Sequence, residues 1–156
     1  MEAVESQTTQ TPDYLCNEGE HLLFVYGTLK RGFSNFHIIK DYKFVAEAKT
    51  VGKFRLTEEY DENWKKWVPY LSKDEEFEIR GEVFKGKDIS LEFLDEFEAV
   101  PLGIYERTSV KVRLSELDEE VTAWVYVGKK NGKYLVKDGF FQEGIDKEAF
   151  YGVTPK

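Results

Sequence analysis

The order of apolar and polar residues along the chain predicts a fold rich in β-strands. Leu22–Tyr26 is a continuous apolar run that ends at Gly27, which is typical of a central strand buried on both faces. Phe77–Phe84 alternates apolar with polar residues over most of its length, and Gly81 within it predicts a bulge or a close approach of another backbone. Further strands are expected at Phe44–Ala48, Gly52–Leu56, Val68–Leu71, Val110–Leu114 and Val121–Val127.

Short helices are expected between these strands. Asn35–Ile39 suits a short helix that packs against the first strand. Ser90 can cap a second helix that carries Glu92 in its first turn, and Pro101 prevents this helix from extending much further. Because β-α-β units do not alternate regularly, we expect an α+β domain. Its centre is a small mixed, partly closed β-barrel of about six or seven strands, with two or three short flanking helices.

The distribution of apolar residues divides the chain into three parts. Residues 1–19 are polar and lack apolar periodicity, so they are expected to form a flexible N-terminal tail. Residues 20–127 hold the predicted strands and helices and form one domain. Residues 128–156 are rich in glycine and lysine, and this C-terminal segment is expected to pack on the domain or to cover it.

The charge balance narrows the classes of partner. The chain has 156 residues, of which 22 are basic and 30 acidic, giving a net charge of −8. Nucleic acids and anionic membranes require clustered lysine and arginine, so neither is expected as a partner. Cys16 is the only cysteine, which excludes an intramolecular disulfide, and His21 and His37 are too few for most zinc sites. No apolar run approaches the roughly 20 residues of a membrane span, and no signal-peptide pattern is present, so a cytoplasmic location is expected.

The second predicted helix carries one carboxylate on an unusual face. With about 100° per residue, its apolar residues gather on one side: Leu91, Phe93, Leu94 and Phe97. Three carboxylates lie opposite them: Glu92, Asp95 and Glu96. Glu98 falls at the edge of the apolar face. Partial burial, together with the like charge of Asp95, would raise the pKa of Glu98 toward the range of a general base. The alternative is that the helix ends there and Glu98 bends out to water.

The turn after the first strand is a candidate anion site. Gly27 permits a positive φ, and the N–H groups of Gly27, Thr28 and Leu29 lose their strand partners once the strand stops. A substrate carboxylate can accept hydrogen bonds from these groups. An ordinary tight turn is the alternative, and Lys30 and Arg31 are more typical of surface residues than of ligands.

Four short motifs, in this order, resemble the γ-glutamylcyclotransferase-like superfamily, especially its γ-glutamylamine cyclotransferase and AIG2-like branch. They are Val25–Gly32 with Asn35, Gly81–Phe84, Leu94–Glu98 with Pro101, and Tyr105–Arg107 leading into a strand. The resemblance spans about Leu23 to Val127, and the small mixed barrel of that family agrees with the elements expected above. It implies an enzyme that cyclises a γ-glutamyl amine or γ-glutamyl amino acid to 5-oxoproline and releases the free amine.

The same resemblance assigns roles to single positions. Glu98 matches the catalytic glutamate, which would take a proton from the α-ammonium group and later pass one to the leaving amine. The substrate-binding candidates are Tyr26, Gly27, Thr28, Leu29, Asn35 and Tyr105. For Asn35 and Tyr105, helix capping and core packing are the ordinary explanations. The implied partner is a small γ-glutamyl substrate, and no metal or organic cofactor is required.

Two other functions stay open at this stage. A binding module for a small acidic metabolite or a protein partner would keep the fold without catalysis, because a fold does not fix a function. An enzyme that acts on a larger γ-glutamyl-protected intermediate would need a wider cavity mouth. The shape of that mouth is expected to depend on the loop Tyr60–Trp67, with the C-terminal segment as a second contributor.

Overall fold

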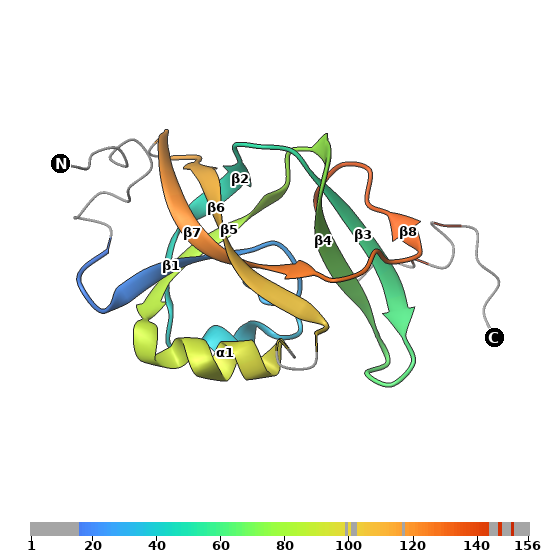
Figure 1. The fold of residues 1–156 in the computed structure, drawn as a ribbon, viewed down its shortest axis with the longest axis horizontal. Coiled ribbons are helices and arrows are strands. Elements are labelled where there is room, and N and C mark those ends of the chain that lie inside the picture. The colour runs from blue at the N-terminus through green and yellow to red at the C-terminus, as the bar shows by residue number, and fades with distance from the viewer. Residues whose placement is uncertain are drawn as a thin grey trace.

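The computed structural model describes residues 16–98, 100, 103–116, 118–143, 147 and 151. Five strands form a closed barrel in the order β1-β5-β2-β6-β7 (Figure 1). Their bounds are Glu20–Val25 for β1, Lys43–Thr50 for β2, Arg80–Lys87 for β5, Tyr105–Leu114 for β6 and Glu119–Gly128 for β7. All neighbours are antiparallel except β1 and β7, which close the barrel as a parallel pair at Leu23 and Trp124.

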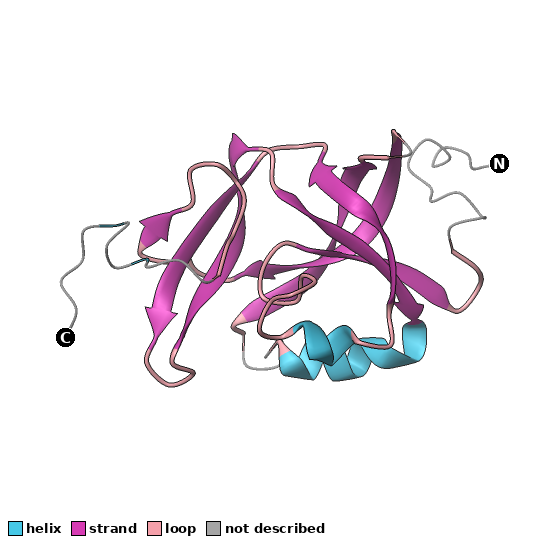
Figure 2. Cartoon of the chain, turned by 180° about the vertical axis from the view of Figure 1, so that it is seen from behind, coloured by secondary structure: helices cyan, strands magenta, loops and turns pink. Residues whose placement is uncertain are grey.

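A second sheet stands beside the barrel. It has the order β4-β3-β8, with β3 at Phe54–Asp61, β4 at Lys66–Phe77 and β8 at Tyr134–Leu135. The helical elements are the α-helix α1 (Leu91–Phe97) and the 3₁₀ helices η2 (Phe36–Ile39) and η3 (Asp88–Ser90). They gather on one side of the barrel, as Figure 2 shows. The expected fold class, a mixed α+β barrel with short flanking helices, is confirmed.

Strand β1 is buried on both faces, as its continuous apolar run predicts. Leu22 and Phe24 point into the core cluster inside the barrel, which includes Val112 and Val125. Leu23 and Val25 alternate with them and join the cluster between the barrel and the helices. Because β1 stands between two cores, the turn that follows it begins from a rigid position.

Gly81 lies where two elements approach closely. A Cβ atom at this position would come 2.3 Å from the carbonyl oxygen of Val25 and 2.8 Å from the ring of Phe24. The register shift of this region lies elsewhere, between Phe44 and Ala46 of β2. Of the two explanations expected for Gly81, the close approach is therefore correct.

Several strand boundaries differ from the sequence-based expectation. Phe77–Phe84 is not one strand, because β4 ends at Phe77 and β5 begins at Arg80. Strand β4 is far longer than the expected Val68–Leu71, and residues 73–76 within it are exposed. An exposed stretch of charged residues carries no apolar alternation, so its sequence gives no strand signal.

The C-terminal segment contributes to the core. Phe141 is fully buried inside the barrel cluster together with Val136, and β8 pairs with β3. Most of the expected N-terminal tail, residues 1–15, lies outside the described residues, as does Pro101. In the part of the chain that the structure describes, no helix has the length and apolar character needed to cross a membrane.

Candidate active site

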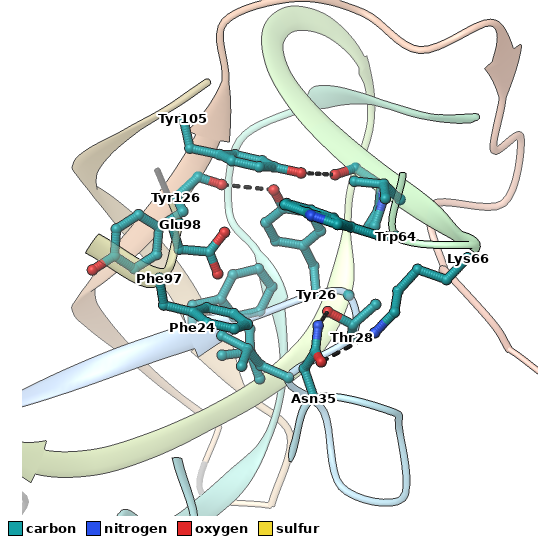
Figure 3. Close-up of a pocket in the computed structure, with 15 residues that line it drawn as sticks. Phe24, Tyr26, Thr28, Asn35, Trp64, Lys66, Phe97, Glu98, Tyr105 and Tyr126 are labelled. Atoms are coloured by element: carbon teal, nitrogen blue, oxygen red, sulfur yellow. Dashed lines mark hydrogen bonds between the residues drawn. The ribbon is translucent and has the colours of Figure 1, made fainter. Parts of the chain in front are cut away.

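A cavity of about 440 Å³ opens between the β1 turn, the C-terminal end of α1 and the β3–β4 hairpin (Figure 3). All seven candidate residues from the sequence line it: Tyr26, Gly27, Thr28, Leu29, Asn35, Glu98 and Tyr105. The sequence did not single out most of the other lining residues, which are Phe24, Val25, Trp64, Lys66, Val68, Pro69, Phe97 and Tyr126. Three segments distant in the chain thus meet around one small-molecule-sized space.

Glu98 is the residue directly after α1, and its N–H donates to the carbonyl oxygen of Leu94 at 2.9 Å. Its carboxyl group points into the cavity, towards Tyr26 and Tyr105 (Figure 3). Among the described residues, no hydrogen-bond donor or cation pairs with this carboxyl group. Burial raises the pKa of Glu98 to about 8, because the apolar surroundings disfavour its charged form.

Asp95 was expected to be exposed and to raise the pKa of Glu98 by its like charge, and the structure shows a different role. It accepts two hydrogen bonds from the guanidinium group of Arg107, at 2.8 and 3.2 Å, and one from the hydroxyl of Tyr126 at 2.7 Å. Burial, and not the charge of Asp95, is the cause that raises the pKa of Glu98. Asp95 instead fastens α1 to β6 and β7.

The expected apolar face of α1 is only partly correct. Leu94 is buried, whereas the side chain of Phe93 is 54% exposed. The helix has only seven residues and contacts the barrel along a narrow stripe. Phe93 lies at the edge of the predicted apolar face and therefore remains in solvent. The end of this stripe leads directly to Glu98.

Two tyrosines form hydrogen-bonded walls of the cavity. The hydroxyl of Tyr26 donates to the carbonyl oxygen of Tyr126 at 2.6 Å, and that of Tyr105 donates to the carbonyl oxygen of Pro69 at 2.5 Å. Burial, followed by the charge of Glu98 among other neighbours, raises the pKa of both hydroxyls. Both tyrosines therefore remain neutral at physiological pH and stand beside the carboxyl group as fixed dipoles.

The turn after β1, which the sequence predicts as an anion site, lines the cavity. Among the described residues, no acceptor binds the N–H groups of Gly27, Thr28 and Leu29. Gly27 does not adopt the positive φ that a glycine permits. A glycine is required because a Cβ atom would come 2.5 Å from Cγ of Pro69.

Asn35 holds the turn in shape rather than capping a helix. Its side-chain Nδ2 donates to Oγ1 of Thr28 at 2.9 Å, and its backbone N–H donates to the carbonyl oxygen of Thr28 at 2.9 Å. The side chain makes no capping hydrogen bond to η2, although Asn35 precedes that helix. The helix-cap explanation of Asn35 is therefore wrong.

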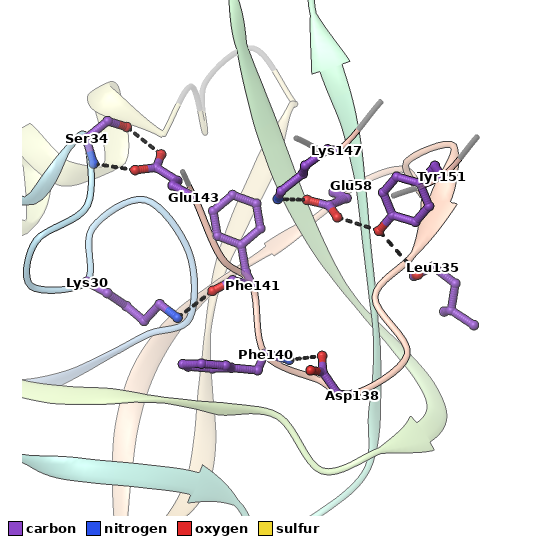
Figure 4. A network of polar contacts seen from close by, with 10 residues as sticks. All are labelled: Lys30, Ser34, Glu58, Leu135, Asp138, Phe140, Phe141, Glu143, Lys147 and Tyr151. Carbon is purple, nitrogen blue, oxygen red and sulfur yellow. Dashed lines mark hydrogen bonds and ion pairs between the residues drawn. The ribbon is translucent and has the colours of Figure 1, made fainter. Parts of the chain in front are cut away.

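Lys30 is buried, contrary to the expectation of a surface residue. It is 2% exposed, and its Nζ donates to the carbonyl oxygen of Phe141 at 2.7 Å (Figure 4). The ammonium group also lies 4.0 Å from the centre of the Phe140 ring, and burial lowers the pKa of Lys30 to about 8. Arg31 is exposed as expected and pairs with Glu82.

The C-terminal segment also contacts residues that follow the β1 turn. The carboxylate of Glu143 accepts hydrogen bonds from the N–H and the hydroxyl of Ser34, at 2.8 and 2.7 Å (Figure 4). Together with the bond from Lys30, these contacts fasten the residues on both sides of Gly32. The C-terminal segment thus stabilises the turn through Lys30 and Ser34.

The β3–β4 hairpin supplies Trp64 and Lys66 to the cavity wall, so part of the loop expected at Tyr60–Trp67 does shape the cavity. Trp67 does not line the cavity and packs against Tyr134 and Tyr151 instead, with ring centres 5.8 Å apart in each case. Among the described residues, no group of three or more His, Cys, Asp or Glu side chains lies close enough together to hold a metal ion.

Comparison with known proteins identifies the family of the chain. The family model for gamma-glutamyl cyclotransferase, AIG2-like, matches residues 23–143, and the chain therefore belongs to this family. A gamma-glutamylaminecyclotransferase of Mus musculus is 34% identical over 144 residues, covering 84% of this chain and 93% of that protein. The Homo sapiens protein of the same name is 35% identical over 100 residues, which cover 61% of this chain and 63% of that protein.

The fold is also shared with a solved structure. The crystal structure of an AIG2-like protein from Mus musculus superposes with a TM-score of 0.66 at 26% identity. The matched region covers 89% of this chain and 98% of that chain. The two proteins thus share one fold over most of this chain.

Proposed function

We propose that this chain is a γ-glutamyl cyclotransferase, which converts a γ-glutamyl amine or γ-glutamyl amino acid to 5-oxoproline and a free amine. The observation that carries the proposal is that one cavity holds the carboxyl group of Glu98 and the N–H groups of the β1 turn, for which the described residues provide no hydrogen-bond partner. Membership of the gamma-glutamyl cyclotransferase family supports the same reaction. The cavity volume of about 440 Å³ favours a small substrate over a large γ-glutamyl-protected intermediate.

In this proposal the two features bind the two ends of the glutamyl group. The α-carboxylate accepts hydrogen bonds from the N–H groups of the β1 turn, and the α-ammonium group lies against the carboxyl group of Glu98. The positive charge of the substrate favours the ionised form of Glu98, which opposes the effect of burial on its pKa. Binding thus produces the carboxylate that the reaction needs.

The reaction then requires one base and one acid, and Glu98 serves as both. It takes a proton from the α-ammonium group, and the freed amine attacks the γ-carbonyl carbon of the same molecule. A five-membered ring forms as this carbon–nitrogen bond is made, and the bond from the γ-carbonyl carbon to the leaving nitrogen breaks. Glu98 passes the first proton to that nitrogen, which leaves as the neutral amine. Glu98 then takes the second proton from the ring nitrogen, so that 5-oxoproline keeps one N–H, and releases this proton to water. Because nucleophile and electrophile share one molecule, the protein has only to hold the substrate in a bent shape.

Product analysis tests the proposal. The purified protein is incubated with γ-glutamyl-ε-lysine, γ-glutamyl-alanine and glutathione, and 5-oxoproline and the free amine are measured together. The proposal predicts equal amounts of both products from at least one compound. If no compound yields 5-oxoproline but one of them binds in calorimetry, the alternative of a small-metabolite binding module is favoured.

A further inference from the structure

The tip of the β3–β4 hairpin has a defined conformation that presents two side chains to the cavity. Lys65 has a φ of 57°, in the left-handed region, and its N–H donates to the carbonyl oxygen of Asp61 at 2.7 Å. The side chain of Asp61 accepts a hydrogen bond from the N–H of Trp64 at 2.9 Å. With this turn fixed, Trp64 and Lys66 line the cavity while Lys65 remains exposed outside it.

Lys66 places a positive charge in the cavity wall. Its Nζ donates to Oδ1 of Asn35 at 3.1 Å and to Oγ of Ser34 at 3.3 Å, and both acceptors are neutral. Within the described part of the chain, no carboxylate lies within ion-pair distance of this ammonium group. A half-buried ammonium group with a donor left over is suited to bind an anion of the substrate.

Lys66 and Glu98 are the two charged residues among those that line the cavity, and they stand on opposite sides of it (Figure 3). In the proposed reaction, Glu98 and the β1 turn engage the two charged groups of the glutamyl part. The leaving amine is then the part of the substrate that remains for the mouth of the cavity. There Trp64, 54% exposed, offers an apolar surface, and Lys66 offers the charge.

We propose that Lys66 is a specificity-determining residue, which selects substrates whose leaving amine carries a carboxylate group. This inference rests on the proposed cyclotransferase function and goes beyond it in naming the residue and the group recognised. A leaving amine with a carboxylate forms a charge-assisted hydrogen bond with Lys66 through the donor that Ser34 and Asn35 do not use. An otherwise identical amine without that carboxylate lacks this contact.

Matched substrate pairs test the role of Lys66. The short pair is γ-glutamyl-alanine and γ-glutamyl-ethylamine, which differ only in the carboxylate. The long pair is γ-glutamyl-6-aminohexanoate and γ-glutamyl-pentylamine, which places the same difference further from the reacting carbon. The value of kcat/KM for 5-oxoproline release is measured with the wild type and with Lys66→Gln. In at least one pair, Lys66→Gln is expected to lower kcat/KM roughly tenfold for the substrate whose leaving amine carries a carboxylate. The value of kcat/KM for the substrate without that carboxylate is expected to change little.

Two further variants separate this role from a structural one. Lys66→Arg keeps the charge and is expected to retain the preference for the acid. Lys65→Gln removes a neighbouring exposed charge and is expected to leave the preference unchanged. If Lys66→Gln lowers kcat/KM equally for both substrates of each pair, the proposal is overturned. Such a result would mean that Lys66 only supports the turn through Asn35. If the wild type releases no 5-oxoproline from any of the compounds, the proposed function itself is overturned, and the role of Lys66 with it.

Discussion

Burial raises the pKa of the Glu98 carboxyl group to about 8 in the folded protein, above its ordinary value of 4.5. The folded state therefore binds a proton that the unfolded chain releases between these two pH values. The resulting contribution to stability is fully present below about pH 4.5 and is lost as the pH rises towards about 8. Glutamine at this position has no such titration.

This difference gives a prediction at the scale of one residue. Between pH 5 and pH 8, the free energy of unfolding should fall more steeply in the wild type than in Glu98→Gln, by on the order of 2 kcal/mol. Urea unfolding at several pH values measures it. Glu92→Gln removes an exposed carboxylate from the same helix and should follow the wild type. Parallel curves for the wild type and Glu98→Gln would show that the site does not disfavour the charged form of Glu98.

The candidate residues taken from the sequence do line the cavity, but the sequence did not predict the hydrogen-bond partners and the burial of the residues near them. The helical pattern placed Glu98 at an edge, and the structure turns this side chain into the cavity. The pattern did not show that Asp95 is bound by Arg107 and Tyr126, because both partners come from distant strands. Lys30 was missed as a buried residue for the same reason, since its acceptor Phe141 lies 111 residues further along the chain.

At the scale of elements, a polar junction at Asp95 holds α1 against the barrel. Asp95 binds Arg107 of β6 and Tyr126 of β7, and Arg107 lies 4.4 Å from the centre of the Trp124 ring. Helix α1 has only seven residues, so its own hydrogen bonds give it little stability. The position of Glu98 at its end depends on this junction.

Asp95→Ala is therefore expected to destabilise the protein by about 1 to 3 kcal/mol and to lower kcat more than it raises KM. Stability falls because Arg107 and Tyr126 lose a charged partner. The value of kcat falls because the carboxyl group of Glu98 is displaced. Urea unfolding and steady-state kinetics measure the two effects. Glu96→Ala changes an exposed carboxylate of the same helix and should be nearly neutral. Wild-type kinetics in Asp95→Ala would mean that the junction does not position Glu98.

Strands with a core on each side were predictable, whereas exposed strands were not. The apolar run of β1 identified it directly, because both of its faces are buried. The outer half of β4 consists of exposed charged residues opposite a register shift of β3, and no periodicity marks it. The hairpin tip with Trp64 lies at the other end of β4. It was expected as a loop, and its polar sequence did not distinguish the residues that line the cavity.

At the scale of the whole molecule, a buried ion pair joins the C-terminal segment to the second sheet. The Nζ of Lys147 donates to the carboxylate of Glu58 on β3, and the hydroxyl of Tyr151 donates to the other oxygen (Figure 4). Both charged side chains are 4% exposed. A buried charge whose partner is removed is strongly unfavourable, so this contact should matter far more than a surface ion pair.

Glu58→Gln is expected to lower the free energy of unfolding by about 3 to 5 kcal/mol, because it leaves Lys147 buried without a negative partner. The neighbouring Glu59 pairs with Lys130, whose side chain is 58% exposed. Glu59→Gln is therefore a matched control, with an expected loss of less than about 1 kcal/mol. Urea unfolding compares the two variants. Equal, small losses would show that the C-terminal segment is not fastened through Glu58.

The overall architecture was predictable because the count of strands and short helices, without β-α-β alternation, already favours a small mixed barrel. The second sheet was not expected, since β8 has only two residues and its partner strand β3 is longer than its pattern indicates. The support that Phe141 and Glu143 give to the β1 turn depends on contacts across more than a hundred residues. Such contacts leave no local signal in the sequence.

The role of Glu98 as the acid and base of a cyclotransferase is the central claim, and one comparison tests it most directly. The rate of 5-oxoproline release at saturating substrate is measured for the wild type, Glu98→Gln and Glu92→Gln, with the folded state of each verified by circular dichroism. The account predicts that Glu98→Gln loses at least about a hundredfold in kcat while Glu92→Gln retains the wild-type value. A folded Glu98→Gln protein whose kcat stays within roughly threefold of the wild type would contradict it.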